Sequence, residues 1–143
     1  MNNWIFVESL FNWENDFQNK FEFLGIRLDV FKNKKFENND KIFTYITKLK
    51  KFSDVRKVIS NEIFDLPNTY EYDKEFTKAI KTKPMKILNQ EDWLDFDNIK
   101  NELEVFALAK SPGLRLLNAP LKLNEFDTKK LESFSWKMAF GEF

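Results

Sequence analysis

Four runs of β-forming residues, near 3–8, 41–48, 52–60 and 76–88, constrain the fold of this chain more than any other feature of its sequence. Aromatic and β-branched side chains, which are enriched in strands, dominate these runs. The run at 3–8 predicts a short buried strand. The run at 76–88 alternates, and its Pro84 favours an edge position or a break. Together the four runs predict one curved sheet.

Helical patterns separate the β-forming runs. Ser9 suits a helix N-cap, and three apolar residues follow it at helical spacing: Leu10, Trp13 and Phe17. A second helix is predicted over 95–109, with the apolar stripe Phe96, Ile99, Leu103 and Phe106. Asn124 caps a predicted third helix, with the stripe Phe126, Leu131, Phe134 and Met138. We expect irregular structure over 20–39 and a short strand at 114–117. Strands with interspersed helices predict an α+β fold.

The residue types that are absent limit the chemistry. The sequence has no cysteine, no histidine and 3 glycines. These absences exclude disulfides, zinc and iron–sulfur sites, Ser-His-Asp triads and imidazole chemistry. Three scattered glycines cannot build a P-loop or a dinucleotide fingerprint. Acids near residue 95 are better explained as helix caps than as Mg²⁺ ligands. We therefore predict no metal, no cofactor and no enzymatic activity.

Length and composition predict one globular domain. The chain has 143 residues, of which 43% are apolar and 17% aromatic. No low-complexity linker divides it, so we expect a single domain over 1–143. Its longest apolar runs fall far short of the roughly 20 residues of a membrane span. The N-terminus does not resemble a secretory signal, which favours a cytoplasmic location.

Charge is balanced overall but unevenly distributed. The 23 basic and 23 acidic residues give a net charge of zero. Residues 27–57 hold ten basic and four acidic groups, for a net charge of +6, and residues 74–86 carry a net +4. Residues 91–104 carry a net −5. The predicted sheet is therefore basic and the predicted helices acidic, so one face could meet a polyanion.

Several strings of residues occur in an order typical of a known family. They are Asn3 to Ser9 followed by Asn12-Trp13, Asn39 to Ile46, Lys51 to Val55 with Val58 to Ser60, Lys81 to Ile87, and Asn124 to Phe134. In this order they resemble EVE domains. Two positions depart from the family: Phe23-Leu24 precedes Gly25 in place of a tryptophan, and Thr77-Lys78-Ala79 replaces a Pro-aromatic-Arg string.

The resemblance implies a PUA-like fold, a curved mixed β-barrel flanked by helices. Relatives of this class include YTH domains, which read methylated adenine in RNA. EVE domains are thought to read modified bases through an aromatic-walled pocket, without catalysis. The resemblance therefore implies a nucleic-acid-binding module for DNA or RNA that recognises a modified base. The alternative is a protein-interaction or accessory subunit that kept the fold and lost base recognition.

Two sets of side chains are candidates for binding. The predicted base pocket combines Asn12, Trp13, Leu24, Tyr45, Phe52 and Lys78. An amide can pair with a base edge, and aromatic rings stack on a base. For Trp13 and Phe52 the alternative is burial in the core. The predicted phosphate contacts are Lys48, Lys51, Lys81, Lys83 and Lys86, for which the alternative is a solvated strand face.

Overall fold

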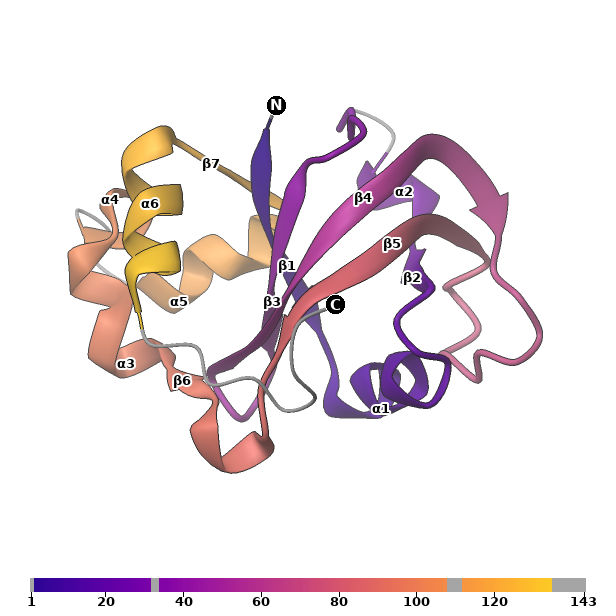
Figure 1. The fold of residues 1–143 in the computed structure, drawn as a ribbon, viewed down its shortest axis with the longest axis horizontal. Helices are drawn as coiled ribbons and strands as arrows, with labels where there is room; N and C mark the ends of the chain where they lie inside the picture. Colours follow the sequence, from indigo (N-terminus) through magenta and orange to yellow (C-terminus); the bar gives the residue numbers. More distant parts are fainter. Residues whose placement is uncertain (1, 32–33, 108–111, 135–143) are drawn as a thin grey trace.

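The computed structural model describes residues 2–31, 34–107 and 112–134, and its strands form one mixed sheet (Figure 1). The strands are β1 (Asn3–Glu8), β2 (Phe23–Ile26), β3 (Lys41–Ile46), β4 (Lys51–Asp65), β5 (Lys78–Ile87), β6 (Leu94–Asp95) and β7 (Leu121–Leu123). Their order is β2-β5-β4-β3-β1-β7, and β6 pairs with β4. The β1–β3 pair is parallel, and the other pairs are antiparallel.

Helices cover both sides of the sheet. They are α1 (Leu10–Gln18), α2 (Leu28–Phe31), α3 (Phe96–Ile99), α4 (Glu104–Ala107), α5 (Pro112–Arg115) and α6 (Glu125–Ser133), with short 3₁₀ turns at Gln90–Asp92, Lys100–Glu102 and Leu116–Asn118. In Figure 1, α3 to α6 gather on one side, and α1 and α2 lie on the other. Among the described helices, none combines the length and apolar character needed to cross a bilayer.

Strand β1 is buried on both faces. Its successive side chains point to opposite sides of the sheet, and on each side they enter a buried cluster. Ile5 is fully buried in the cluster beneath α3, α4 and α6. Trp4 and Phe6 join a separate cluster inside the curve of the sheet. The predicted buried strand is therefore confirmed, and the core divides between the two faces.

The predicted strands near 41–48, 52–60 and 76–88 are confirmed as β3, β4 and β5. The first predicted helix is confirmed as well, with Ser9 Oγ accepting from the backbone N–H of Asn12 at 3.1 Å. In the turn that precedes β3, Asn39 has φ 76°. This left-handed conformation favours glycine or asparagine, which explains an asparagine at this position.

The prediction of irregular structure over 20–39 is wrong, because this segment contains β2 and α2. Both elements have four residues, too few to show a period in sequence. The predicted strand at 114–117 is also wrong: these residues lie in α5 and a 3₁₀ turn, and the strand follows as β7. In β7, buried Leu121 and Leu123 flank an exposed lysine.

The predicted helix over 95–109 is broken into α3, a 3₁₀ turn and α4, while 108–109 lie outside the described residues. Its four stripe residues are nevertheless all buried. The break occurs because Leu103 is extended and the Asp127 carboxylate accepts from the N–H groups of Glu104 and Val105, at 2.7 and 3.0 Å. That carboxylate caps a new helix start.

The last predicted helix is confirmed as α6. The Asn124 side chain caps it by accepting from Asp127 N–H at 2.7 Å. Of its predicted stripe, Leu131 is buried, whereas Phe126 is 53% exposed, which corrects that assignment. Met138 lies outside the described residues.

Candidate functional site

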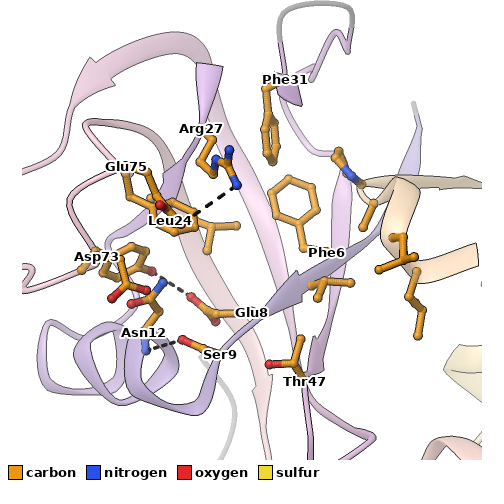
Figure 2. A pocket seen from close by; sticks show the side chains of 18 residues that line it. Phe6, Glu8, Ser9, Asn12, Leu24, Arg27, Phe31, Thr47, Asp73 and Glu75 are labelled. Atoms are coloured by element: carbon orange, nitrogen blue, oxygen red, sulfur yellow. Dashed lines mark hydrogen bonds and ion pairs between the residues drawn. The ribbon is translucent and has the colours of Figure 1, made fainter. Parts of the chain in front are cut away.

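A cavity of about 380 Å³ opens where the end of β1, the start of α1 and strand β2 meet (Figure 2). The loop between β4 and β5 and the segment before β7 complete its lining. Ligand sites in proteins usually fall between 300 and 1,000 Å³, so the cavity can hold a small planar group.

Aromatic and aliphatic side chains form much of the lining. They are Phe6, Phe31, Tyr72, Phe76, Val7, Leu24, Leu116 and Leu117. Phe6 and Phe31 meet edge to face with ring centroids 5.2 Å apart, and Figure 2 shows them together on one side. Tyr72 and Phe76 meet in the same way at 5.5 Å. Such rings offer a flat ligand both apolar contact and stacking.

Asn12 supplies an unusual polar group. Its side chain lines the cavity, is 2% exposed, and its Oδ1 has no hydrogen-bond partner within the described residues. A buried acceptor left without a partner costs about 1–3 kcal/mol. A ligand that donated a hydrogen bond here would remove that cost.

The loop between β4 and β5 is held against α1 and β2, which brings Tyr72 to the cavity. The Asn15 side chain accepts from Glu71 N–H at 2.8 Å, and the Tyr70 hydroxyl accepts from Phe23 N–H at 2.9 Å. Burial raises the pKa of Tyr70 to about 12, so the hydroxyl stays protonated. The hydroxyl of Tyr72 donates a hydrogen bond to Glu8 Oε2 at 2.8 Å.

Behind the cavity lies a buried ionic cluster around Arg56. The guanidinium, with no exposed surface, donates to Glu8 at 3.1 Å, to Asp16 at 2.7 Å and to Asp54 at 2.9 Å. Trp13 Nε1 also donates to Asp54, at 2.8 Å. Burial opposes the Arg56 charge, but the three carboxylates outweigh it and hold the Arg56 pKa above its ordinary value. Arg56 is one of the ten basic groups of segment 27–57. Because it is buried and paired with acids, it contributes nothing to the basic charge of the surface.

Glu8 and Asp16 meet at the hydroxyl of Tyr72. Tyr72 Oη contacts carboxylate oxygens of both Glu8 and Asp16, yet a hydroxyl has one hydrogen. Burial, followed by the charge of Glu8, raises the pKa of Asp16 well above its ordinary value. The charge of Arg56 and the hydrogen bond from Tyr72 lower the pKa of Asp16 but do not outweigh burial and Glu8. Glu8 joins this cluster to the cavity, because it also lines the cavity.

The structure separates the residues predicted to form the base pocket. Asn12 and Leu24 line the cavity, and the other four do not. Trp13 packs in the core against Trp93 at 5.0 Å. Tyr45 and Phe52 pack 5.6 Å apart beneath α3 and have no place in the cavity. Lys78 forms an ion pair with Asp65.

The five lysines predicted to contact phosphate lie outside the cavity lining. Lys48 is exposed in the turn between β3 and β4, and Lys51 lies 3.8 Å from Asp95. Lys81 and Lys83 are on β5, and Lys86 lines a small separate cavity beside Glu132. Their role in phosphate binding stays a prediction.

Sequence reasoning missed the residues that do line the cavity, chiefly Phe6, Glu8, Phe31 and Tyr72. One signal was available: Glu8 ends an apolar strand, and a buried charge needs a partner. Phe31 lies in a helix of four residues, and Tyr72 lies in a loop, where no periodicity indicates direction.

Gly25 gives the first prediction. A Cβ at this position would lie 2.4 and 2.5 Å from ring carbons of Tyr72, whose hydroxyl is fixed on Glu8. Gly25→Ala should therefore displace the ring and lower the free energy of unfolding by about 1–3 kcal/mol. Urea unfolding measures the change. The matched control is Gly113→Ala, where a Cβ meets nothing within 4 Å. Equal losses in the two variants would contradict close packing at Gly25.

Comparison with known proteins identifies the fold. In sequence, the chain matches no family model and no curated protein. In structure, it is similar to the Pho92 YTH domain solved in complex with m6A, with a TM-score of 0.64 at 12% identity, covering 96% of this chain and 89% of that chain. The YTH domain of Zygosaccharomyces rouxii MRB1 protein, in complex with N6-methyladenosine RNA, gives a TM-score of 0.60 at 8% identity, covering 91% and 84%.

A hypothetical protein from Leishmania major is similar to the same degree, with a TM-score of 0.60 at 14% identity and 92% of each chain covered. At such identities the likeness establishes the fold alone. The chain therefore has an α+β fold of the type found in YTH domains, which confirms the predicted α+β class, while the PUA-like barrel stays a prediction.

Proposed function

We propose that residues 1–143 form a single EVE-type domain of the PUA-like class that binds nucleic acid without catalysis. One base, modified or not, enters the cavity at the β1–α1 junction. The observation that carries this proposal is the cavity itself, whose lining combines the Oδ1 of Asn12, buried and without a partner among the described residues, with the aromatic pair Phe6 and Phe31. Support comes from the fold, because structurally similar YTH domains are seen with RNA.

Energetics favour a base that is already unpaired. Extruding a base from a duplex costs a few kcal/mol, and stacking on an aromatic side chain returns roughly 1–3 kcal/mol per base. The cavity is lined by three acids and one arginine, so the phosphates of the strand must stay outside it. We therefore propose single-stranded RNA as the first ligand to test, and the lysines of β5 and of the β3–β4 turn as its phosphate contacts.

The second prediction concerns salt. If three or four lysines neutralise phosphates, log K for a single strand should fall with log salt at a slope of about −2 to −3. Fluorescence polarisation of a labelled RNA at several salt concentrations measures this slope. The double variant Lys81→Ala, Lys83→Ala should flatten it and weaken all sequences alike.

The matched control is Lys129→Ala, which removes an exposed lysine paired with Glu125 on α6. It should leave the slope unchanged. Absence of RNA and DNA binding even at low salt would contradict the proposed function and favour the protein-interaction alternative.

A further inference from the structure

The polar groups that line the cavity accept hydrogen bonds more than they donate them. Three lining residues are acidic, namely Glu8, Asp73 and Glu75, and the lining has a single basic residue, Arg27. Arg27 is already engaged, because its guanidinium lies 4.0 Å from Glu75 and 3.2 Å from Asp29 outside the lining. The cavity therefore favours a ligand that donates hydrogen bonds.

Two acceptors line the cavity near the junction of β1 and α1, on Glu8 and Asn12 (Figure 2). Oδ1 of Asn12 has no partner among the described residues. Each oxygen of Glu8 accepts one bond, from Arg56 at 3.1 Å and from Tyr72 at 2.8 Å. A carboxylate has about four acceptor positions, so Glu8 retains capacity for a ligand. Arg56 and Tyr72 also fix its orientation.

A donor is available beside these acceptors. The Ser9 hydroxyl lines the cavity and accepts from Asn12 N–H, which leaves its own hydrogen for a ligand acceptor. Glu8 and Asn12 thus offer acceptors and Ser9 offers a donor, and the three residues lie close together in the sequence.

Building on the function proposed above, we propose that the base taken into this cavity is a guanine. The pairing edge of guanine carries two adjacent donors, the N1–H and the 2-amino group, next to the acceptor O6. Adenine and neutral cytosine each place a ring acceptor beside one amino group, and that acceptor would face the Glu8 carboxylate. Uracil has one N–H between two carbonyl oxygens. Guanine therefore complements Asn12, Glu8 and Ser9 best.

The experiment compares short single-stranded RNAs that differ only in one central nucleotide, which is guanosine, inosine, adenosine or cytidine, in a strand otherwise of uridine. Fluorescence polarisation at low salt gives the four dissociation constants. Guanosine should bind tightest, and inosine, which lacks the 2-amino group, about tenfold more weakly. Adenosine and cytidine should bind more weakly than inosine.

Variants assign the effect to the cavity. Asn12→Ala removes the unpaired acceptor but keeps the backbone N–H that Ser9 caps, so the variant should fold and lose most of the guanosine preference. The matched control is Asn98→Ala, an exposed amide on α3, which should keep it. Glu8→Gln tests the second acceptor; its folding is checked by urea unfolding, because Glu8 pairs with Arg56.

The outcomes separate the two proposals. Equal or tighter binding of adenosine or cytidine, with RNA binding intact, overturns the guanine assignment and leaves the proposed function standing. An unchanged guanosine preference in Asn12→Ala overturns the assignment too. Failure of all four RNAs and of the corresponding DNA strands to bind overturns the proposed function itself.

Discussion

Replacing Arg56 with methionine should lower the free energy of unfolding by about 3–5 kcal/mol, because breaking a buried ionic cluster on one side leaves its charges uncompensated. Arg56 has no exposed surface and pairs with Glu8, Asp16 and Asp54. Methionine fills part of the space but donates no hydrogen bond. Urea unfolding monitored by tryptophan fluorescence measures the loss.

The matched control for Arg56 is Arg27→Met. The Arg27 side chain is 42% exposed, and its ion pair with Asp29 is exposed as well, so this change should cost no more than about 1 kcal/mol. A loss in Arg56→Met as small as that of the control would contradict the cluster as described. Lowering the pH should partly restore Arg56→Met, because protonation neutralises the stranded carboxylates.

Much of the fold could be predicted from sequence where a local pattern was long enough. Strand β1 and helix α1 follow from a dense aromatic run, the Ser9 cap and helical spacing. Helix α6 was predicted in the same way, from Asn124 as its N-cap. Helices α3 and α4 were merged into one because the apolar stripe continues across the break, and the capping Asp127 lies 23 residues from Glu104.

The site was harder to predict because its parts meet only in three dimensions. Asn12 and Leu24, both predicted for the base pocket, do line the cavity, and their role in binding stays a prediction. Trp13, Tyr45 and Phe52 are buried in the core instead, because large aromatic side chains remove a large apolar surface from water there. Tyr72 reaches Glu8 across 64 residues of chain, and no local pattern records such a contact.

The raised pKa assigned to Asp16 predicts an unusual dependence of stability on pH. The pKa of a buried carboxyl usually falls when it pairs with an arginine, but here burial and Glu8 raise the pKa of Asp16 well above 3.8 despite Arg56. At pH values between 3.8, the ordinary pKa, and the raised pKa of the folded state, Asp16 binds a proton in the folded state but not in the unfolded state. The contribution of Asp16 is therefore complete below about pH 4 and is lost as pH rises toward the folded-state pKa.

Asp16→Asn tests this assignment because asparagine is the uncharged isostere of the protonated acid. Its carbonyl can accept from Arg56, as Asp16 does, and its amide can donate to Tyr72 Oη. The variant should therefore fold. The difference in unfolding free energy, wild type minus variant, should fall as pH rises from 4 to the folded-state pKa, by up to about 1.4 kcal/mol per pH unit.

Urea unfolding of both proteins at intervals from pH 4 to pH 8 gives this difference directly, and other titrating groups cancel in it. Asp97→Asn is the matched control. A hydrogen bond from Lys100 and its charge lower the pKa of exposed Asp97, so its contribution is present above about pH 4 and is lost only as pH falls below that. The difference in unfolding free energy between wild type and Asp97→Asn should therefore be constant between pH 5 and pH 8. A level or rising difference for Asp16→Asn over the same range would mean that the pKa of Asp16 is not raised in the folded state.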